Sequence, residues 1–368
     1  MMINNHVTFL EIDGQAIEHN LKYFKEKLNP TTKILAVVKA FGYGSDGVEI
    51  AKFLENKVDY FAVAYAHEGI AIRNADVKTP ILVLHPQIPN LKSIIEYKLE
   101  PNLYNFKIFD AFLQLADQEI LLNYPVHLKF NTGLNRLGFW HNDIPKIISS
   151  IKTNKHVKIQ SLFSHLAASE DLEEKEFTNN QLNNFAYIAK QFYKHLDYKP
   201  ILHTLNTSGV VNYSEAQFDM VRIGIGLYGF GNDAKETSFL KNTHNLKSII
   251  SQIHLIEPGE TVGYNRAFKA EIKSKTATIP IGHADGLSRK LGNENGYVLI
   301  NDKKAKIIGN VCMDMIMVDV TNIDCNEGDE VVIFNNQEMI INNSKTSETI
   351  VYETLTAISQ RIKKILKK

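Results

Sequence analysis

The sequence predicts a (β/α)8 barrel followed by an all-β domain. From residue 34 to about residue 230, short apolar runs rich in β-branched residues alternate with longer segments of helical periodicity, which is the pattern of parallel βα units. After about residue 235 the helical patterns thin out, and strand-like runs separated by turn sequences take over. We therefore expect a barrel domain over residues 1–235 and a C-terminal β domain over residues 236–368.

Eight strand candidates occur in the barrel part of the chain. They span residues 34–38, 60–65, 81–85, 99–104, 126–130, 159–165, 201–205 and 220–224. The segments between them, such as GVEIAKFLEN, carry apolar residues at helical spacing. Eight repeats over roughly 200 residues suit a (β/α)8 barrel, and a doubly wound sheet stays open as an alternative if one or two strand assignments are wrong.

The second part of the chain reads as strands joined by turns. The runs SIISQIHLI, ATIPIG, YVLIN, AKIIGNV, MIMVDV and EVVIF are separated by sequences such as PGE, NENG and NEGDE. The last stretch, ETIVYETLTAISQRIKKILKK, returns to helical spacing. It predicts a final helix whose basic end is solvated.

Composition limits the classes of partner. Lys plus Arg and Asp plus Glu both number 41, so no basic field favours nucleic acid or an anionic membrane. The two cysteines, Cys312 and Cys325, show neither metal-type spacing nor a disulfide framework. The N-terminus lacks the features of a secretory signal, and no uncharged apolar run approaches ~18 residues. We expect a cytoplasmic protein that acts on a small molecule, without a metal site, a nucleic-acid partner or a membrane partner.

Reactive side chains gather where the predicted strands end. In a βα barrel the strand-to-helix loops converge at the carboxyl ends of the strands, and the active site lies there. The candidates at these ends are Lys39, Lys129, Arg136, His165, Asn206, Thr207, Ser208 and Arg222. A single strand-end lysine is more often a solvated charge, and a single histidine is more often a hydrogen-bonded core residue. Their placement at one mouth of the barrel favours a shared site.

Glycine-rich turns beside these residues indicate a phosphate site. The segments 41–45 (FGYGS), 207–209 (TSG) and 222–226 (RIGIG) put backbone N–H groups and hydroxyls near strand ends, where they can hold a phosphate. None of the three is a Walker or Rossmann fingerprint. A lysine beside phosphate-binding turns indicates pyridoxal 5'-phosphate held as a Schiff base.

Nine segments together resemble one family, the pyridoxal-phosphate-dependent alanine racemases. They are FLEIDGQAIEHNL, AVVKAFGYG, KFNTGLNRLGF, SHLAASE, HTLNTSG, VRIGIGLYG, VGYNRAF, IPIGHADGLSRKLGN and IIGNVCMDMIMVDVT. They follow the family's order and spacing from one end of the chain to the other. The resemblance implies the barrel-plus-β-domain fold and the interconversion of L- and D-alanine, which supplies D-alanine for peptidoglycan.

The resemblance also implies roles for particular residues. Lys39 would bind the cofactor covalently and act as one acid/base group, and Tyr264 from the other subunit of a homodimer would be the second. Tyr43, Ser208, Gly224 and Ile225 would bind the phosphate, and Arg222, supported by His203, would contact the pyridine nitrogen. His165 would orient Tyr264. Arg136 would bind the cofactor's phenolic oxygen and the substrate carboxylate, and Met313 of the other subunit would add a backbone N–H.

Three positions need separate comment within this resemblance. Lys129 occupies a place at which several family members carry a carbamylated lysine that orients the arginine matching Arg136; an unmodified Lys129 would need another anion, such as chloride. His283 in IGHADG replaces the family's entrance tyrosine. Gln360 stands where some members have a tyrosine that touches the phosphate.

Other activities stay open at this stage. A racemase for serine or another small amino acid is the nearest alternative. A decarboxylase of the same fold class typically has an acidic partner for the pyridine nitrogen, and Arg222 argues against it. A barrel that carries pyridoxal phosphate without turnover would have no use for the β domain with Tyr264 and Met313.

Overall fold

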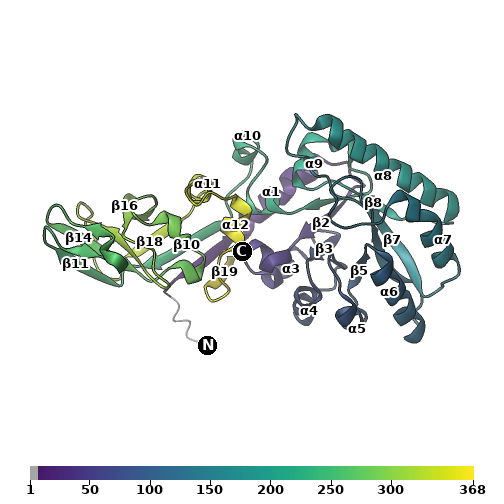
Figure 1. Ribbon diagram of the computed structural model, residues 1–368, viewed down its shortest axis with the longest axis horizontal. Helices are drawn as coiled ribbons and strands as arrows, with labels where there is room; N and C mark the ends of the chain where they lie inside the picture. The colour runs from purple at the N-terminus through teal and green to yellow at the C-terminus, as the bar shows by residue number, and fades with distance from the viewer. Residues whose placement is uncertain (1–6) are drawn as a thin grey trace.

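The barrel lobe of the molecule is built on an eight-stranded parallel sheet, seen in a computed structural model that describes residues 7–368 (Figure 1). The order along the sheet is β8-β7-β6-β5-β4-β3-β2-β9. The strands are β2 (Lys33–Val37), β3 (Tyr60–Val63), β4 (Ile81–Val83), β5 (Glu100–Leu103), β6 (Tyr124–Lys129), β7 (Val157–Phe163), β8 (Ile201–His203) and β9 (Met220–Ile223). All eight predicted strands are present, and each ends one or two residues before its predicted carboxyl end.

The two ends of this sheet approach each other, which closes the barrel. The backbone N–H of Asp219 donates to Leu202 O (3.1 Å), and that of Arg222 donates to Leu205 O (3.0 Å). These bonds join the β8 and β9 segments, so the doubly wound alternative is wrong. Strands β3, β4 and β9 are buried at every residue, as expected for strands covered on both faces.

Helices surround the barrel strands. They are α1 (Gly14–Glu26), α2 (Lys39–Tyr43), α3 (Gly47–Leu54), α4 (Ala66–Asn74), α5 (Leu91–Glu96), α6 (Phe106–Gln118), α7 (Ile144–Lys152), α8 (Lys175–His195), α9 (Thr207–Asn212) and α10 (Ala234–Ser238). Several begin at a side-chain cap: Asp13, Asp46 and Asn105 accept backbone N–H groups of the first turns of α1, α3 and α6. Such caps satisfy donors that have no partner within the helix.

A second lobe, rich in strands, lies beside the barrel and gives the molecule its elongated shape (Figure 1). Its nine-stranded sheet has the order β11-β14-β17-β16-β15-β18-β10-β1-β19. The strands are β1 (Phe9–Asp13), β10 (His244–Ile249), β11 (Gln252–Ile256), β14 (Ser274–Ile279), β15 (Tyr297–Ile300), β16 (Lys303–Ile308), β17 (Ile316–Asp319), β18 (Glu330–Phe334) and β19 (Lys363–Lys367), and the lobe also holds β12 (Thr261–Val262), β13 (Phe268–Lys269), α11 (Gln337–Thr346) and α12 (Val351–Thr356).

The two ends of the chain meet in this sheet. Strand β1 pairs in parallel with β19, with Phe9 opposite Lys363, and antiparallel with β10. Residues 9–13 therefore belong to the sheet of the second lobe, although the sequence groups them with the barrel. The prediction of a final helix is wrong beyond α12, because residues 363–367 form β19. Helical spacing in a short basic segment does not reveal a pairing partner at the other end of the chain.

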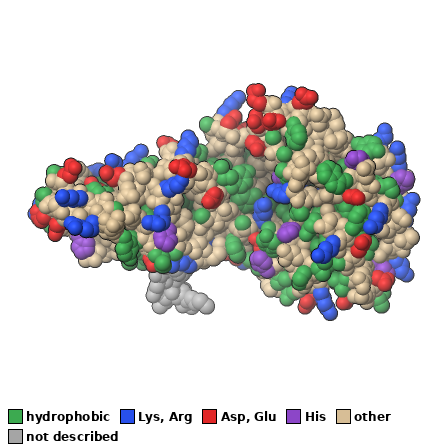
Figure 2. All heavy atoms as spheres, in the orientation of Figure 1, with side chains coloured by type: hydrophobic (Ala, Val, Ile, Leu, Met, Phe, Trp, Pro, Cys, Tyr) green, Lys and Arg blue, Asp and Glu red, His purple; other side chains and the backbone are tan. Residues whose placement is uncertain are grey.

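Charges of both signs are interspersed over the face of both lobes shown in Figure 2, in keeping with the balanced composition. Within residues 7–368 no helix has the length and apolar character needed to cross a membrane.

Candidate active site

A cavity of about 290 Å³ opens at the carboxyl ends of the barrel strands. It brings together most of the residues that the sequence singles out. Its lining includes Lys39, Tyr43, Lys129, Arg136, His165, Asn206, Thr207, Arg222, Gly224 and Ile225, together with Tyr352 from the second lobe. The sequence-predicted cluster at one barrel mouth is therefore present.

Lys39 is delivered to the cavity by an unusual turn. It follows β2 and begins α2, in which Ala40, Phe41 and Gly42 all have left-handed backbone angles, with φ of 52°, 53° and 64°. A left-handed conformation costs non-glycine residues roughly 1–2 kcal/mol each, so the turn needs external support. The carboxylate of Glu68 supplies it by accepting the backbone N–H groups of Ala40 (2.6 Å) and of residues 64 and 65.

The electrostatic environment favours the neutral amine of Lys39. Burial lowers its pKa, the positive charge of Arg136 lowers it further, and Glu68 acts in the opposite direction. A neutral amine is the form that attacks an aldehyde or removes a proton. The cavity thus prepares Lys39 for either task.

Arg222 is buried and held from several sides. Its Nη1 donates to His203 Nδ1 (2.8 Å) and to His203 O (3.2 Å). Its Nη2 donates to the carbonyl oxygens of Ser164 (2.8 Å) and Thr204 (2.8 Å), and His165 Nδ1 lies 3.1 Å from the same nitrogen. Among the residues that the structure describes, no hydrogen bond uses Nε, so the guanidinium keeps one donor for a ligand in the cavity.

These contacts also fix the state of two histidines. Arginine only donates, so His203 Nδ1 accepts from Nη1 and the proton of His203 lies on Nε2. A proton on His165 Nδ1 would face the cationic Nη2 at 3.1 Å, so the proton of His165 also lies on Nε2. Burial and the charge of Arg222 lower the pKa of both imidazoles well below the ordinary value. His165 lines the cavity as a neutral ring with its Nε2 donor free of Arg222, whereas His203 lies behind Arg222, away from the cavity lining.

Lys129 adds a further cation beneath Arg136. Burial lowers its pKa to about 7, with contributions from the charges of Arg136, Arg222 and Lys39. No salt bridge to Lys129 occurs among residues 7–368, and its Nζ lies 5.8 Å from the centre of the Phe163 ring. The lysine therefore sits among positive charges, and its lowered pKa makes the neutral amine accessible near neutral pH.

One end of the cavity is shaped by backbone close to Tyr43. A Cβ atom added to Gly224 would lie 2.4 Å from Tyr43 Oη, so only glycine allows this approach. Thr207 Oγ1 accepts the backbone N–H groups of Gly224 (3.2 Å) and Gly226 (3.3 Å), which ties the loop after β9 to the start of α9. Ser208 follows Thr207 and is buried beside the lining rather than in it.

Tyr264 and Met313 do not line this cavity. They lie on the second lobe in a shallow hollow that also includes Cys312, Asp314 and Met315. Tyr264 is 74% exposed and Met313 is 58% exposed. Asn310 Nδ2 donates to Tyr264 O (3.1 Å) and fixes the short helix that carries the tyrosine, η5 (Tyr264–Arg266). Within one chain, Tyr264 and Met313 therefore lie close to each other but outside the cavity that contains Lys39.

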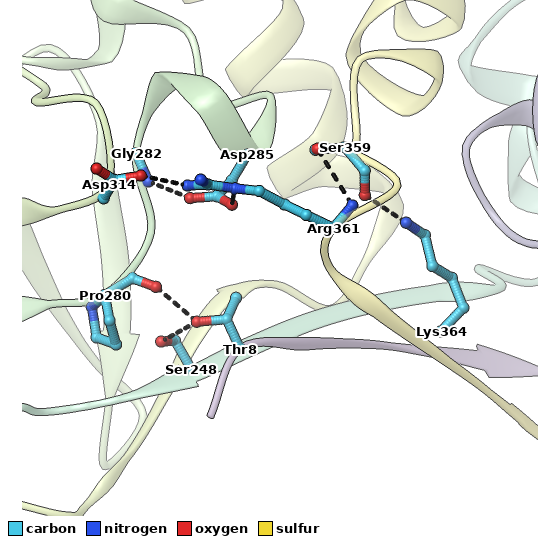
Figure 3. A network of polar contacts seen from close by, with 9 residues as sticks. All are labelled: Thr8, Ser248, Pro280, Gly282, Asp285, Asp314, Ser359, Arg361 and Lys364. Carbon is cyan, nitrogen blue, oxygen red and sulfur yellow. Dashed lines mark hydrogen bonds and ion pairs between the residues drawn. The ribbon is translucent and has the colours of Figure 1, made fainter. Parts of the chain in front are cut away.

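The segment that carries Met313 is braced by Arg361 (Figure 3). Arg361 Nε donates to Asp285 Oδ1 (2.6 Å), and Nη2 donates to Asp314 Oδ1 (2.6 Å). Asp285 in turn accepts the backbone N–H of Gly282 (2.8 Å). His283 lies exposed on this same loop, away from the Lys39 cavity, and its backbone N–H donates to Cys312 O (2.9 Å).

Tyr352, which the sequence reasoning missed, contributes to the cavity in place of Gln360. Its ring lies 6.0 Å from that of Tyr43, whereas Gln360 lies outside the Lys39 cavity, near Phe41 and His67. The assignment of Gln360 is therefore wrong. The motif IVYETL contained the needed signal, since it is a tyrosine in a helical segment near the C-terminus.

Comparison with known proteins gives one family over nearly the whole chain. The model described as "Alanine racemase, N-terminal domain" matches residues 12–231, and "Alanine racemase, C-terminal domain" matches residues 243–366. An alanine racemase of Fusobacterium nucleatum subsp. nucleatum is 36% identical over 370 residues, which cover 98% of this chain and 99% of that protein.

Solved structures show the same fold. Alanine racemase from Clostridium difficile in complex with cycloserine has a TM-score of 0.91 and 30% identity, with 99% of this chain and 96% of that chain covered. Alanine racemase from Bartonella henselae with covalently bound pyridoxal phosphate has a TM-score of 0.86 and 28% identity, with 98% and 100% covered.

Proposed function

The chain belongs to the alanine racemase family, and we propose that it interconverts L- and D-alanine with pyridoxal 5'-phosphate bound at Lys39. The observation that carries the proposal is the cavity in which a lysine of lowered pKa lies with Arg136, His165 and Arg222. A racemase needs an amine that can bind an aldehyde, a cation for the substrate carboxylate, and a group that faces the ring nitrogen.

The cavity fits the cofactor in three respects. Lys39 offers an amine of lowered pKa, Arg222 keeps Nε as a donor without an acceptor in residues 7–368, and Gly224 leaves room beside Tyr43 where a side chain would clash. Tyr43, Ser208, Gly224 and Ile225 would hold the phosphate, and Arg222 would face the pyridine nitrogen. When bound, the cofactor supplies an aldehyde for the amino group and a ring that accepts electrons from Cα.

Arg222 keeps its own proton when it faces a ring nitrogen, because guanidinium is a very weak acid. A ring nitrogen that only accepts a hydrogen bond withdraws fewer electrons than a protonated one. In our proposal this limits side reactions such as transamination, and His203 holds Arg222 in the required orientation.

Racemisation needs proton transfer on both faces of Cα. Lys39 Nζ would take or return the proton on one face, and Tyr264 Oη from a second copy of the chain would do so on the other. His165 carries its proton on Nε2 and would donate it to that tyrosine, which favours the phenolate. The exposure of Tyr264 on the second lobe supports a site shared between two copies.

The substrate would be held by its carboxylate. Arg136 provides a guanidinium at the cavity wall, and guanidinium pairs with carboxylate through two parallel hydrogen bonds. The backbone N–H of Met313 from the second copy would add a donor. Together with the small size of the cavity, this arrangement favours alanine as the substrate. We also propose that the enzyme acts in the cytoplasm, where it supplies D-alanine for peptidoglycan.

The proposal is tested by mixing the purified protein with pyridoxal phosphate and L-alanine and following the optical rotation. We expect the rotation to decay to zero, and an absorbance band of the Lys39-bound cofactor that is missing in Lys39→Ala. L-Serine and larger L-amino acids serve as competing substrates. Turnover of serine without turnover of alanine would contradict the choice of substrate, and absence of the band would contradict the cofactor.

A further inference from the structure

A chain of buried polar side chains crosses the barrel interior from the base to Arg222. Glu100 Oε2 lies 2.7 Å from His127 Nε2, His127 Nδ1 lies 2.6 Å from Ser161 Oγ, and Ser161 Oγ lies 2.9 Å from His203 Nε2. His203 Nδ1 then accepts from Arg222 Nη1 at 2.8 Å. All five residues are buried, four of them to at least 95%.

The strands arrange this chain in order. Glu100 begins β5, His127 lies within β6, Ser161 lies within β7, His203 ends β8, and Arg222 lies on β9. Strands β5 to β8 are successive neighbours in the sheet, β9 meets β8 where the barrel closes, and His127 and Ser161 are direct register partners. The chain therefore rises from the amino ends of the strands to the carboxyl ends, where the cavity lies.

With an ionised Glu100 and a neutral His127, the two ends of the chain fix the direction of every hydrogen bond in it. Arg222 can only donate, so His203 Nδ1 accepts and its proton lies on Nε2, which donates to Ser161 Oγ. Ser161 then donates its single hydroxyl proton to His127 Nδ1. His127 carries its proton on Nε2 and donates to Glu100, and an ionised carboxylate only accepts. Every hydrogen bond then donates in the direction from Arg222 toward Glu100. One consistent set of neutral histidine tautomers therefore connects the guanidinium to the carboxylate.

No lysine or arginine forms an ion pair with Glu100 among the described residues. Its imidazole contact with His127 is the one ion-pair geometry found for Glu100 in the described residues. Tyr60 and Tyr124 lie near enough for Glu100 to raise the pKa of both phenols, and Arg73 feels its charge more weakly than its own burial. Arg73 itself donates to the carbonyl oxygens of Val77 and Thr79. The hydrogen-bonded path from Glu100 thus leads to Arg222.

We propose that Glu100 is a positioning residue for Arg222 and acts through His127, Ser161 and His203. A carboxylate that accepts from His127 makes the opposite ring nitrogen a better acceptor, and the same polarisation passes along the chain because hydrogen bonds in series strengthen one another. His203 then accepts more strongly from Arg222 and holds the guanidinium in a fixed orientation. This inference rests on the proposed function, in which Arg222 faces the cofactor ring.

The proton positions test the first part of the inference without any assay of activity. Neutron diffraction from the deuterium-exchanged full-length protein should show deuterium on Nε2 of both His127 and His203 and on Ser161 Oγ directed at His127. Deuterium on Nδ1 of either histidine, or a Ser161 hydroxyl directed at His203, would overturn the relay. This result stands whether or not the protein racemises alanine.

Two variants test the functional part. Glu100→Gln keeps an acceptor for His127 but removes the charge, and Ser161→Ala breaks the chain while leaving Glu100 in place. With cofactor bound, we expect each variant to lower kcat for alanine by roughly tenfold, as for other supporting residues behind a site, to leave KM nearly unchanged, and to shift the absorbance maximum of the bound cofactor.

Glu119→Gln is the matched control, since it removes one carboxylate from an exposed ion pair with Lys92. It should leave kcat and the spectrum as in the unmodified protein. The inference would be overturned if Glu100→Gln kept the kcat and the spectrum of the unmodified protein, whether or not Ser161→Ala lowered kcat. A wild-type protein that does not turn over alanine would instead contradict the proposed function.

Discussion

Lys39, Lys129, Arg136 and Arg222 bring positive charge to one small cavity. Each of them lowers the pKa of a neighbour: Arg136 acts on Lys39, Arg136, Arg222 and Lys39 act on Lys129, and Lys129 acts on His165. This mutual repulsion costs stability, and anionic ligands offset it, because the phosphate and the substrate carboxylate both carry negative charge. The residues are therefore arranged for ligands rather than for the stability of the empty chain.

Lys129 is the residue whose chemistry follows most directly from its surroundings. With a pKa of about 7, much of its amine is neutral at neutral pH and can attack CO₂ to form a carbamate, which would place an anion beside Arg136. We predict that the intact mass of the protein in bicarbonate buffer exceeds the sequence mass by one CO₂ and that Lys129→Gln lacks the addition. We also expect Lys129→Ala to raise KM for alanine by roughly tenfold.

The alternative for Lys129 is an unmodified amine with a bound halide. An unchanged mass together with an anomalous chloride signal beside Lys129 would contradict carbamylation.

His244 predicts how stability depends on pH. It is fully buried between Ser45 Oγ (2.8 Å) and Thr243 Oγ1 (2.8 Å), and burial lowers its pKa to about 3. An unfolded histidine titrates near ~6.5, so below that pH the unfolded chain binds a proton that the folded chain does not. Stability is complete above this value and falls as the pH drops toward the folded pKa, by up to about 1.4 kcal/mol per pH unit for this residue.

Urea unfolding between pH 7.5 and 5 measures this slope. His244→Gln should show a shallower loss of stability with falling pH than the unmodified protein, although His165 and His203 keep part of the slope. His19→Gln, which changes an exposed histidine, is the control and should keep the full slope. Equal slopes in all three proteins would contradict the assignment.

At the scale of elements, α12 of the second lobe is packed against the turn that carries Lys39. Gly44 ends that turn with φ of 80°, and a Cβ atom there would lie 1.9 Å from Leu355 O of α12. The same helix brings Tyr352 to the cavity beside Tyr43. The position of α12 and the left-handed turn therefore depend on each other.

Gly44→Ala should both destabilise the protein and weaken cofactor binding, since it strains the turn and displaces α12. Gly259→Ala is the matched control, because Gly259 has φ of 92° with no atom within 4 Å of an added Cβ. We expect a loss of about 1 kcal/mol for the control and of about 3 kcal/mol for Gly44→Ala, from the usual cost of left-handed backbone plus the clash. Urea unfolding and cofactor titration measure both effects. Equal losses would contradict a tight contact between Gly44 and α12.

The sequence predicted the barrel better than the sheet of the second lobe, for a physical reason. Barrel strands such as β2, β3 and β4 are short apolar runs followed by a helical segment, so the pattern is local and repeats along the chain. Strand β19 has the sequence KKILK, which shows no alternation of apolar and polar residues, and its partner β1 lies more than three hundred residues away. The pairing of β19 with β1 is a long-range contact, and the local sequence of β19 does not reveal it.

The same distinction applies to the site. Lys39, Arg136, His165 and Arg222 follow from strand ends, because topology alone gathers them at one mouth. Tyr352 is visible in the sequence as a tyrosine in a helical segment near the C-terminus, but its place beside Tyr43 depends on contact between the two lobes. The relay from Glu100 has no sequence signature, because Glu100, His127 and Ser161 are single polar residues on three separate strands and meet only in the folded barrel.

At the scale of the whole molecule, the proposed reaction requires a second copy of the chain. The apolar side chains Leu255, Tyr264, Ile272, Met313 and Met315 are exposed on the second lobe, whereas the cavity of Lys39 lies at the barrel. A symmetric dimer presents the same surface twice and completes two equal sites at once. A site with Lys39 from one copy and Tyr264 from the other is the central claim.

Subunit mixing tests this claim most directly. Lys39→Ala and Tyr264→Phe should each be nearly inactive as homodimers. A hybrid of the two has one site in which Lys39 of the Tyr264→Phe chain meets Tyr264 of the Lys39→Ala chain, and that site is unaltered. Unfolding and refolding the two variants together in equal amounts should restore about a quarter of the wild-type alanine racemisation rate, since half of the dimers are hybrids with one intact site of two. A mixture no more active than the mean of its components would show that both groups act within a single chain, and would contradict the shared site.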